Sequence, residues 1–255
     1  MQEQVLEIID EQTGEFLARI RVTRPVCGQS EGTACVMINS GRVGSFDGTQ
    51  DEVKLFDDVR AALGERGVAC FEIDLPDRGG ENEIGGELIA LRLRRVRRML
   101  FHPEFLPYRE RYTFLALSLG GQVVLRYLAS IEINAPVPVR AVLISTVIEC
   151  PIVVQLPVAV INLLFGENDF VGYITPDEAN VKLLSPHAYA GQSLDRLVVR
   201  RSQQVTCHIL RGCGHILNSV MPQAADAREY LVDLIAPLVP ANAPAAIDAV
   251  QISCR

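Results

Sequence analysis

Short apolar runs alternate with segments of helical periodicity along most of the chain. Eight runs have the length and apolar character of β-strands, at residues 5–10, 16–22, 33–39, 68–74, 112–117, 139–146, 157–165 and 205–211. Continuous apolar runs of this kind are typical of parallel strands that are covered on both faces. Segments with apolar residues at helical spacing lie at residues 51–63, 81–100, 120–130 and 222–239. The pattern predicts an α/β fold with a mostly parallel central sheet of about eight strands and helices on both faces.

The first two predicted strands differ from the rest because a short turn joins them. Residues 5–10 and 16–22 are separated by EQTGE, in which Gly14 suits a tight turn, so we expect an antiparallel hairpin. The chain has 255 residues and shows neither an internal repeat nor a shift in composition. This length fits one domain, 1–255. Within it we expect a lid segment at 170–203 and a loosely held, Ala- and Pro-rich tail at 240–255.

Composition narrows the range of partners. The net charge of −7 argues against nucleic acid or an anionic membrane surface as the main partner. No apolar run approaches the roughly 20 residues that span a bilayer, and the N-terminus lacks the pattern of a secretory signal. Seven cysteines are scattered without CxxC spacing, which favours a cytoplasmic protein with reduced thiols and no metal site. Nothing in the sequence indicates a metal, an organic cofactor or an oligomeric state.

Ligands of such sheets bind at the carboxyl ends of the strands, so candidate residues should directly follow strands. Ser118 meets this criterion because it lies between the strand 112–117 and the helix 120–130, in the stretch Ala-Leu-Ser-Leu-Gly-Gly. A sharp turn between strand and helix presents a serine hydroxyl above the sheet, and the helix N-terminus offers free N–H groups. Ser118 is therefore a candidate nucleophile, and a helix-capping serine is the alternative.

A serine nucleophile needs a base and a carboxylate that orients the base. Asp169 follows the strand 157–165 in GENDF, and His215 follows the last strand in GCGH. The predicted triad is thus Ser118, Asp169 and His215, in this chain order. Glu149, which follows the strand 139–146, is the alternative acid.

Several motifs in this order resemble those of the α/β-hydrolase superfamily, and the resemblance extends from about residue 5 to residue 239. The matching stretches are SGRVGS (40–45), EIDLPDRGGEN (72–82), ALSLGG (116–121), LLFGENDFV (163–171) and RGCGHIL (211–217). The resemblance implies an oxyanion hole formed by the backbone N–H groups of Arg42 and Leu119. Ser40 departs from the family pattern, in which histidine is frequent at this place. Ala116 stands where the motif usually has its first glycine.

Other candidates fit the same criterion less well. His208 lies inside a strand, His102 precedes the nucleophile strand, and His187 lies in the segment after Asp169. Cys213 shares the loop of His215 and has no helix N-terminus to lower the pKa of its thiol. Asp74, after the strand 68–74, is expected to stabilise a turn.

The expected activity is hydrolysis of a carboxylic ester or thioester through a covalent acyl-enzyme. The connection between the sixth and seventh strands is too short for a large cap. The segment 170–203 carries the apolar residues Leu183, Leu184, Tyr189 and Leu194, which would favour an apolar acyl part in a small-molecule substrate. Three alternatives stay open: an acyltransferase, a peptidase, or a non-catalytic protein of this fold that binds a small molecule or a partner.

Overall fold

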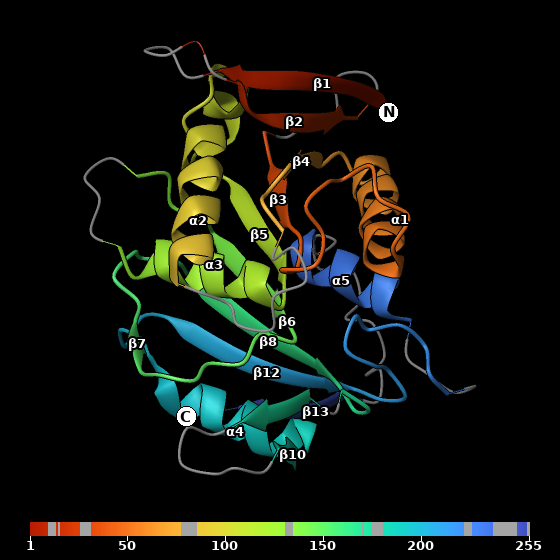
Figure 1. Cartoon of the computed structure of the whole chain (residues 1–255), viewed down its shortest axis with the longest axis vertical. Coiled ribbons are helices and arrows are strands. Elements are labelled where there is room, and N and C mark those ends of the chain that lie inside the picture. The colour runs from red at the N-terminus through yellow and green to blue at the C-terminus, as the bar shows by residue number, and fades with distance from the viewer. Residues whose placement is uncertain are drawn as a thin grey trace.

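A nine-stranded sheet forms the centre of the molecule (Figure 1). The computed structural model describes residues 1–9, 14, 16–25, 32–77, 86–130, 135–169, 171–174, 181–221, 226–236 and 249–253. The strand order is β1-β2-β4-β3-β5-β6-β8-β12-β13. The strands are β1 (Gln2–Ile9), β2 (Phe16–Arg24), β3 (Ala34–Ile38), β4 (Ala69–Ile73), β5 (Tyr112–Leu117), β6 (Arg140–Ile144), β8 (Val160–Gly166), β12 (Gln204–Leu210) and β13 (Ala249–Ser253).

The first eight strands of this sheet are the eight that the apolar runs predict. β1 and β2 form the expected antiparallel hairpin, and β2 pairs antiparallel with β4. From β4 to β12 all neighbouring strands run parallel. The carboxyl ends of β3, β5, β6, β8 and β12 therefore lie along one edge of the sheet, which is where the candidate residues follow them.

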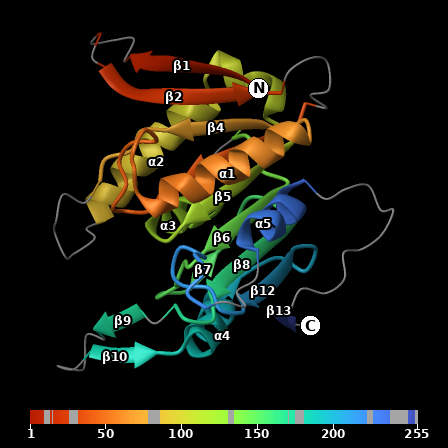
Figure 2. The same cartoon turned by 90° about the vertical axis from the view of Figure 1, so that its right-hand side faces the viewer.

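Helices cover both faces of the sheet. On one face α1 (Asp51–Glu65) and α5 (Ala227–Ile235) pack together, and both lie in front of the sheet in Figure 2. On the other face lie α2 (Gly86–Leu100), α3 (Leu119–Leu128) and α4 (Pro186–Arg196). Each face buries its own apolar cluster, because side chains of successive strand residues point to opposite faces. The predicted starts of two helices, 81–85 and 222–225, lie outside the described residues.

No large cap interrupts the connection between the sixth and seventh strands, as predicted. Residues 145–159 are all described and contain only the short strand β7 (Ile152–Val153). This strand pairs in parallel with β11 (Leu197–Val198), outside the main sheet. The connection between β6 and β8 therefore places no cap domain over the carboxyl ends of the strands, where the candidate residues lie.

The lid expected at 170–203 stays a prediction, because residues 170 and 175–180 lie outside the described part. A hairpin follows Asp169, formed by β9 (Val171–Ile174) and β10 (Val181–Leu184), and then comes α4. Tyr189 on α4 is fully buried, and its ring centroid lies 5.0 Å from that of Phe165. α4 is thus a packed helix of the fold. The side chains of Leu183 and Leu184, which were expected to line a lid, lie outside the described part.

Of the predicted loose tail, 240–255, the structure describes only residues 249–253. Ala249–Ser253 forms β13, which pairs antiparallel with β12 and adds a strand to the sheet edge. Residues 237–248, 254 and 255 lie outside the described residues. The run AVQIS is short, and the neighbouring alanines and prolines hide it from a search for strand periodicity.

Candidate active site

Ser118 occupies a strained turn between β5 and α3. Its φ of 51° and ψ of −115° lie in a region that residues other than glycine rarely adopt. The Ser118 N–H donates a 2.8 Å hydrogen bond to the carbonyl of Ile144, which holds the turn against β6. A Cβ atom at Gly120 would lie 2.5 Å from the carbonyl oxygen of Ile38, so only glycine lets α3 approach β3 this closely. The side chain of Ser118 is only partly buried, as a nucleophile requires.

Asp169 and His215 are brought together although 46 residues separate them in the sequence. The Nδ1 atom of His215 and Oδ1 of Asp169 lie 2.8 Å apart, at hydrogen-bond distance. The Asp169 side chain is 2% exposed, whereas the His215 side chain is 41% exposed. The hydroxyl of Tyr189 donates to the backbone carbonyl of Asp169, so α4 anchors the acid turn. A buried carboxylate thus orients a histidine whose ring reaches solvent.

The end of β6 connects the serine turn to the histidine loop. The hydroxyl of Ser145 donates a 2.6 Å hydrogen bond to the backbone carbonyl of His215. The next residue, Thr146, donates through its hydroxyl to the carbonyls of Ser118 and Ile144, at 3.3 and 3.1 Å. Three successive residues of one strand end therefore contact both the nucleophile turn and the histidine loop.

The structure does not join Ser118 and His215 directly. No hydrogen bond links the hydroxyl of Ser118 to the ring of His215, although both residues are described. Hydrogen bonds of catalytic groups are often long without substrate and shorten in the complex. The structure therefore places Asp169 and His215 at hydrogen-bond distance, and the triad remains part of the proposal below.

The two residues expected to supply the oxyanion hole lie on adjacent segments. A Cβ atom at Gly41 would lie 2.8 Å from Cδ2 of Leu119, so the loop after β3 packs directly against the start of α3. The Arg42 N–H donates to the hydroxyl oxygen of Ser40 at 3.3 Å. The Arg42 side chain is exposed to solvent.

Two buried charged residues support this loop, and sequence reasoning did not identify either. Glu52, in the first turn of α1, accepts hydrogen bonds from the backbone N–H and the hydroxyl of Ser40, the latter at 2.6 Å. Arg92 is 0% exposed, and its Nη2 donates to the carbonyls of Ser40 (2.6 Å) and Val43 (3.1 Å). In the sequence Arg92 is one of five arginines in the segment that forms α2. Its place on the buried face of the helix is visible only in the fold.

Burial dominates the electrostatics of this pair. Desolvation raises the pKa of the Glu52 carboxyl, while the hydrogen bonds from Ser40 and the nearby charges of Arg92 and His215 act in the opposite direction. Desolvation likewise lowers the pKa of Arg92 to about 10, an effect that the charge of Glu52 partly offsets. The carboxylate and the guanidinium therefore each make the burial of the other less costly.

The second half of the loop is tied to β2 and β4. Asp74 accepts a 2.7 Å hydrogen bond from Nε of Arg19 and a 3.3 Å bond from the N–H of Phe46. The Arg19 guanidinium also lies 5.0 Å from the centre of the Phe46 ring. Asp74 thus stabilises a turn, as the sequence predicts. Residues 78–82 of the same motif lie outside the described part.

The other candidate residues have different environments. Glu149, the alternative acid, is exposed to solvent. His208 is buried and bonds to Thr206 and Tyr230. Cys213 is fully buried, and His102 accepts a hydrogen bond from the backbone at the start of the short 3₁₀ helix η1 (Pro103–Tyr108). His187 lies exposed in the first turn of α4.

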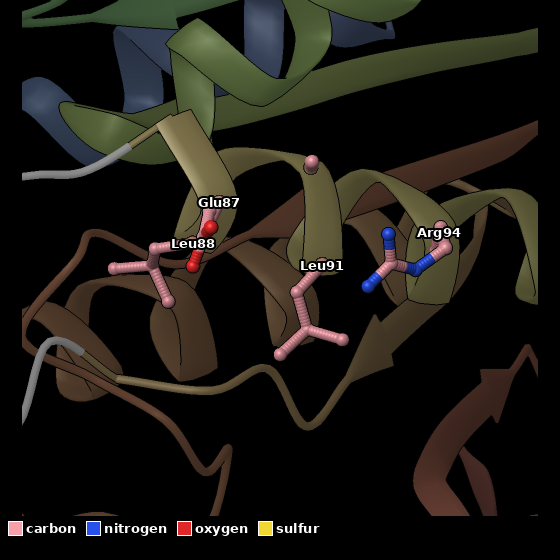
Figure 3. A pocket seen from close by; sticks show the side chains of 5 residues that line it. Glu87, Leu88, Leu91 and Arg94 are labelled. Carbon is pink, nitrogen blue, oxygen red and sulfur yellow. The ribbon is translucent and has the colours of Figure 1, made fainter.

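A hollow of about 520 Å³ lies on the outer face of α2. Figure 3 shows the residues that line it, Glu87, Leu88, Ala90, Leu91 and Arg94. All five come from the single helix α2. This hollow includes none of the candidate catalytic residues, and we give it no part in the chemistry.

Among the described residues, no group of three or more His, Cys, Asp or Glu side chains is placed to hold a metal ion. No helix in this part of the chain is long and apolar enough to cross a membrane.

Comparisons with known proteins identify the fold. No family model and no curated protein matches the sequence. Among solved structures, the esterase domain of a Rhodothermus marinus protein matches at 14% identity, over 92% of this chain and 97% of that chain, with a TM-score of 0.56. An α/β serine hydrolase homologue from Coxiella burnetii matches at 11% identity over 92% and 97%, with a TM-score of 0.55. A serine hydrolase without a lid from Xanthomonas campestris matches at 15% identity over 85% and 87%, with a TM-score of 0.51.

These structural matches, together with the strand order and the turn at Ser118, define the fold class of the protein. The chain has the α/β-hydrolase fold, as the motifs predict. At such low identity the comparisons show the fold alone, so the activity of this particular protein has to be argued from its own residues.

Proposed function

We propose that this protein is a serine hydrolase that cleaves a carboxylic ester or thioester through a covalent acyl-enzyme. The observation that carries the proposal is that a strained serine turn and a carboxylate-bonded histidine both follow parallel strands, at the same end of the sheet. Ser118 has a φ of 51°, and His215 and Asp169 lie 2.8 Å apart. Strain at a partly exposed serine together with an oriented base is typical of nucleophilic catalysis. The esterases and serine hydrolases among the structural neighbours are consistent with it.

In the proposed first step, Ser118 Oγ attacks the carbonyl carbon while Nε2 of His215 takes the serine proton. Asp169 keeps the proton of the neutral imidazole on Nδ1 and stabilises the imidazolium that forms. The carbonyl oxygen becomes an oxyanion that accepts hydrogen bonds from the N–H groups of Leu119 and Arg42. Each such donor contributes roughly 3 kcal/mol to the transition state.

The tetrahedral intermediate then collapses. His215 gives its proton to the leaving alcohol or thiol, and the acyl group stays on Ser118 as an ester. A water molecule gives a proton to His215 and attacks the acyl carbon, and a second collapse returns the proton to Ser118 and releases the acid. Atoms balance over the cycle, because one water is consumed for each ester or thioester cleaved.

Exposed apolar side chains shortly after His215 in the chain support a substrate with an apolar acyl part. Val220 and Met221 are 50% and 51% exposed, although both are large hydrophobic residues. Val220 packs against the backbone of Gly214, next to His215. An acyl chain that covers these side chains would gain about 25 cal/mol for each Å² of apolar surface removed from water.

The test is a fluorophosphonate label on the purified protein, located by peptide mass spectrometry, together with p-nitrophenyl ester and thioester turnover. We expect one adduct, on Ser118, and a loss of roughly 10⁴- to 10⁶-fold in kcat for Ser118→Ala. Ser130→Ala is the matched control, because Ser130 lies just beyond the other end of α3 and donates to a helix carbonyl. Labelling elsewhere, or unchanged turnover by Ser118→Ala, contradicts the proposal.

The missing contact between Ser118 and His215 favours one second candidate, a non-catalytic protein that binds a small molecule at this site. That function predicts saturable binding of an ester without turnover and without fluorophosphonate labelling. Acyl transfer and peptide cleavage would use the same three residues. A panel of acyl acceptors and aminoacyl amides, run beside the esters, separates these reactions from hydrolysis.

A further inference from the structure

Ser40 connects the two buried charges to the expected oxyanion donor. Its side chain has one proton, which it donates to Oε2 of Glu52 at 2.6 Å. A hydroxyl that has donated its proton can only accept further hydrogen bonds. The Ser40 hydroxyl oxygen accepts a hydrogen bond from the backbone N–H of Arg42, at 3.3 Å. Glu52 therefore determines which way Ser40 presents its lone pairs, and Ser40 determines where the Arg42 N–H points.

Arg92 bonds both ends of the turn formed by residues 40–43. Its Nη2 atom donates to the carbonyls of Ser40 and Val43, which flank Gly41 and Arg42. With both carbonyls held, the peptide groups between them are restrained from rotating. This matters at an oxyanion hole, because a flipped peptide would present a carbonyl oxygen where an N–H is needed.

The hydrogen bond from the Arg42 N–H to the Ser40 hydroxyl is long, as expected for an N–H that must turn to an oxyanion during the reaction. At 3.3 Å this hydrogen bond is longer than the usual 2.7–3.2 Å and correspondingly weak. The N–H is thus satisfied in the resting protein and can be shared with an oxyanion at small cost. Gly41 packs directly on Leu119, so the second expected donor is adjacent.

We propose that Ser40, Glu52 and Arg92 form a positioning cluster that aims the Arg42 N–H into the oxyanion hole. The inference rests on the proposed function and deepens it. Ser40 replaces the histidine that is frequent at this place in related proteins, and a buried carboxylate and guanidinium hold it. In this proposal the three residues act through the backbone of Arg42 and not by contact with the substrate.

The test compares Ser40→Ala and Ser40→Thr with the wild type on a p-nitrophenyl ester. Ser40→Ala removes the acceptor of the Arg42 N–H and leaves the backbone N–H at position 40 to bond Glu52. We expect kcat to fall by roughly 10- to 100-fold with KM within about twofold, since a misplaced donor weakens the transition state and not substrate binding. Affinity for a trifluoromethyl ketone, whose adduct with Ser118 carries an oxyanion, should fall in parallel. Ser40→Thr keeps the hydroxyl and should restore most of kcat.

Ser45→Ala is the matched control. Ser45 lies in the same loop, and its hydroxyl also accepts the N–H two residues on, from Asp47 at 3.2 Å. Its contacts lead to Arg19 and not to Glu52 or Arg92. We expect its kcat to stay within about twofold of the wild type. An equal fall in Ser45→Ala and Ser40→Ala, or a folded Ser40→Ala with unchanged kcat, overturns the inference.

Glu52→Gln tests the inference even if Ser40→Ala does not fold. The amide that replaces the carboxylate can donate to Ser40 Oγ, where it competes with the Arg42 N–H for the lone pairs. We expect the same loss of kcat with little change in KM, and a folded variant with full kcat overturns the inference. Fluorophosphonate labelling of the wild type distinguishes failure of the proposed function from failure of this inference. A wild type that is neither labelled nor active refutes the proposed function together with the inference, whereas an active wild type with fully active variants refutes the inference alone.

Discussion

The Ser145 hydroxyl donates a 2.6 Å hydrogen bond to the backbone carbonyl of His215. Ser145 is buried and has a φ of 47°, a value that residues other than glycine seldom adopt. Its own N–H donates to Leu164 at the neighbouring strand. A strained, buried residue held by two strong hydrogen bonds fixes the height of the histidine loop above the sheet.

Removing the hydroxyl at this position should therefore slow the reaction. We expect both Ser145→Ala and Ser145→Gly to lower kcat by roughly 10-fold, because the base moves relative to Ser118. Glycine adopts the positive φ without strain, so the pair of variants separates the loss of the hydrogen bond from backbone strain. Steady-state kinetics with both folded variants is the measurement. Normal kcat in the glycine variant would show that the hydroxyl has no positioning role.

Asp169 should be the acid that orients His215. In Asp169→Asn the amide cannot accept the Nδ1 proton in the same way, so the tautomer of the histidine is no longer fixed. We expect kcat to fall by about 10⁴-fold with little change in KM. Glu149→Gln should retain kcat within about twofold, since Glu149 is exposed to solvent. The reverse result, with Glu149→Gln inactive and Asp169→Asn active, would assign the acid to the end of β6.

The segment after Asp169 should behave as part of the core and not as a lid. Tyr189 is fully buried against Phe165 and donates to the carbonyl of Asp169. Tyr189→Ala should lower the free energy of unfolding by roughly 3–5 kcal/mol, as for other large aromatic residues in cores. His187→Ala, at an exposed position on the same helix, should change it by less than about 0.5 kcal/mol. Urea unfolding of the two variants decides between a packed helix and a mobile lid.

His208 should make the fold less stable in mild acid. Burial lowers the pKa of this histidine below its ordinary value, and the Tyr230 hydroxyl lies 2.6 Å from its Nδ1. Since the folded pKa is depressed, the stabilising effect of the neutral ring is present above pH about 6.5, the unfolded value. It is lost as the pH falls through the lower folded value.

The measurement is the free energy of unfolding as a function of pH for the wild type and for His208→Gln. The wild type should lose more of this free energy between about pH 7 and pH 5 than the variant does. Parallel curves for the two proteins would show that His208 does not titrate on unfolding in this range.

Much of the fold could be predicted from the sequence because its signals are local. The eight apolar runs became the eight strands, since each run is long and apolar enough to be recognised alone. The turn at Ser118 and the positions of Asp169 and His215 after strands follow from the same local patterns. α4 was missed because Gly191 and few apolar residues leave PHAYAGQSLDR with a weak helical stripe, and β13 because AVQIS is short.

Periodicity and turn residues act over a few positions, so the order of the elements and the residues at the strand ends can be read from the sequence alone. Contacts between groups that are distant in the chain cannot be read in this way, because they arise when the strands assemble. The fold brings Asp169 to His215, and it brings the hydroxyl of Ser145 to the carbonyl of His215. It also brings Glu52 and Arg92 into hydrogen bonds with Ser40. The physical reason is that parallel strands collect their carboxyl ends at one edge, and burial there makes each polar group depend on partners far away in the chain.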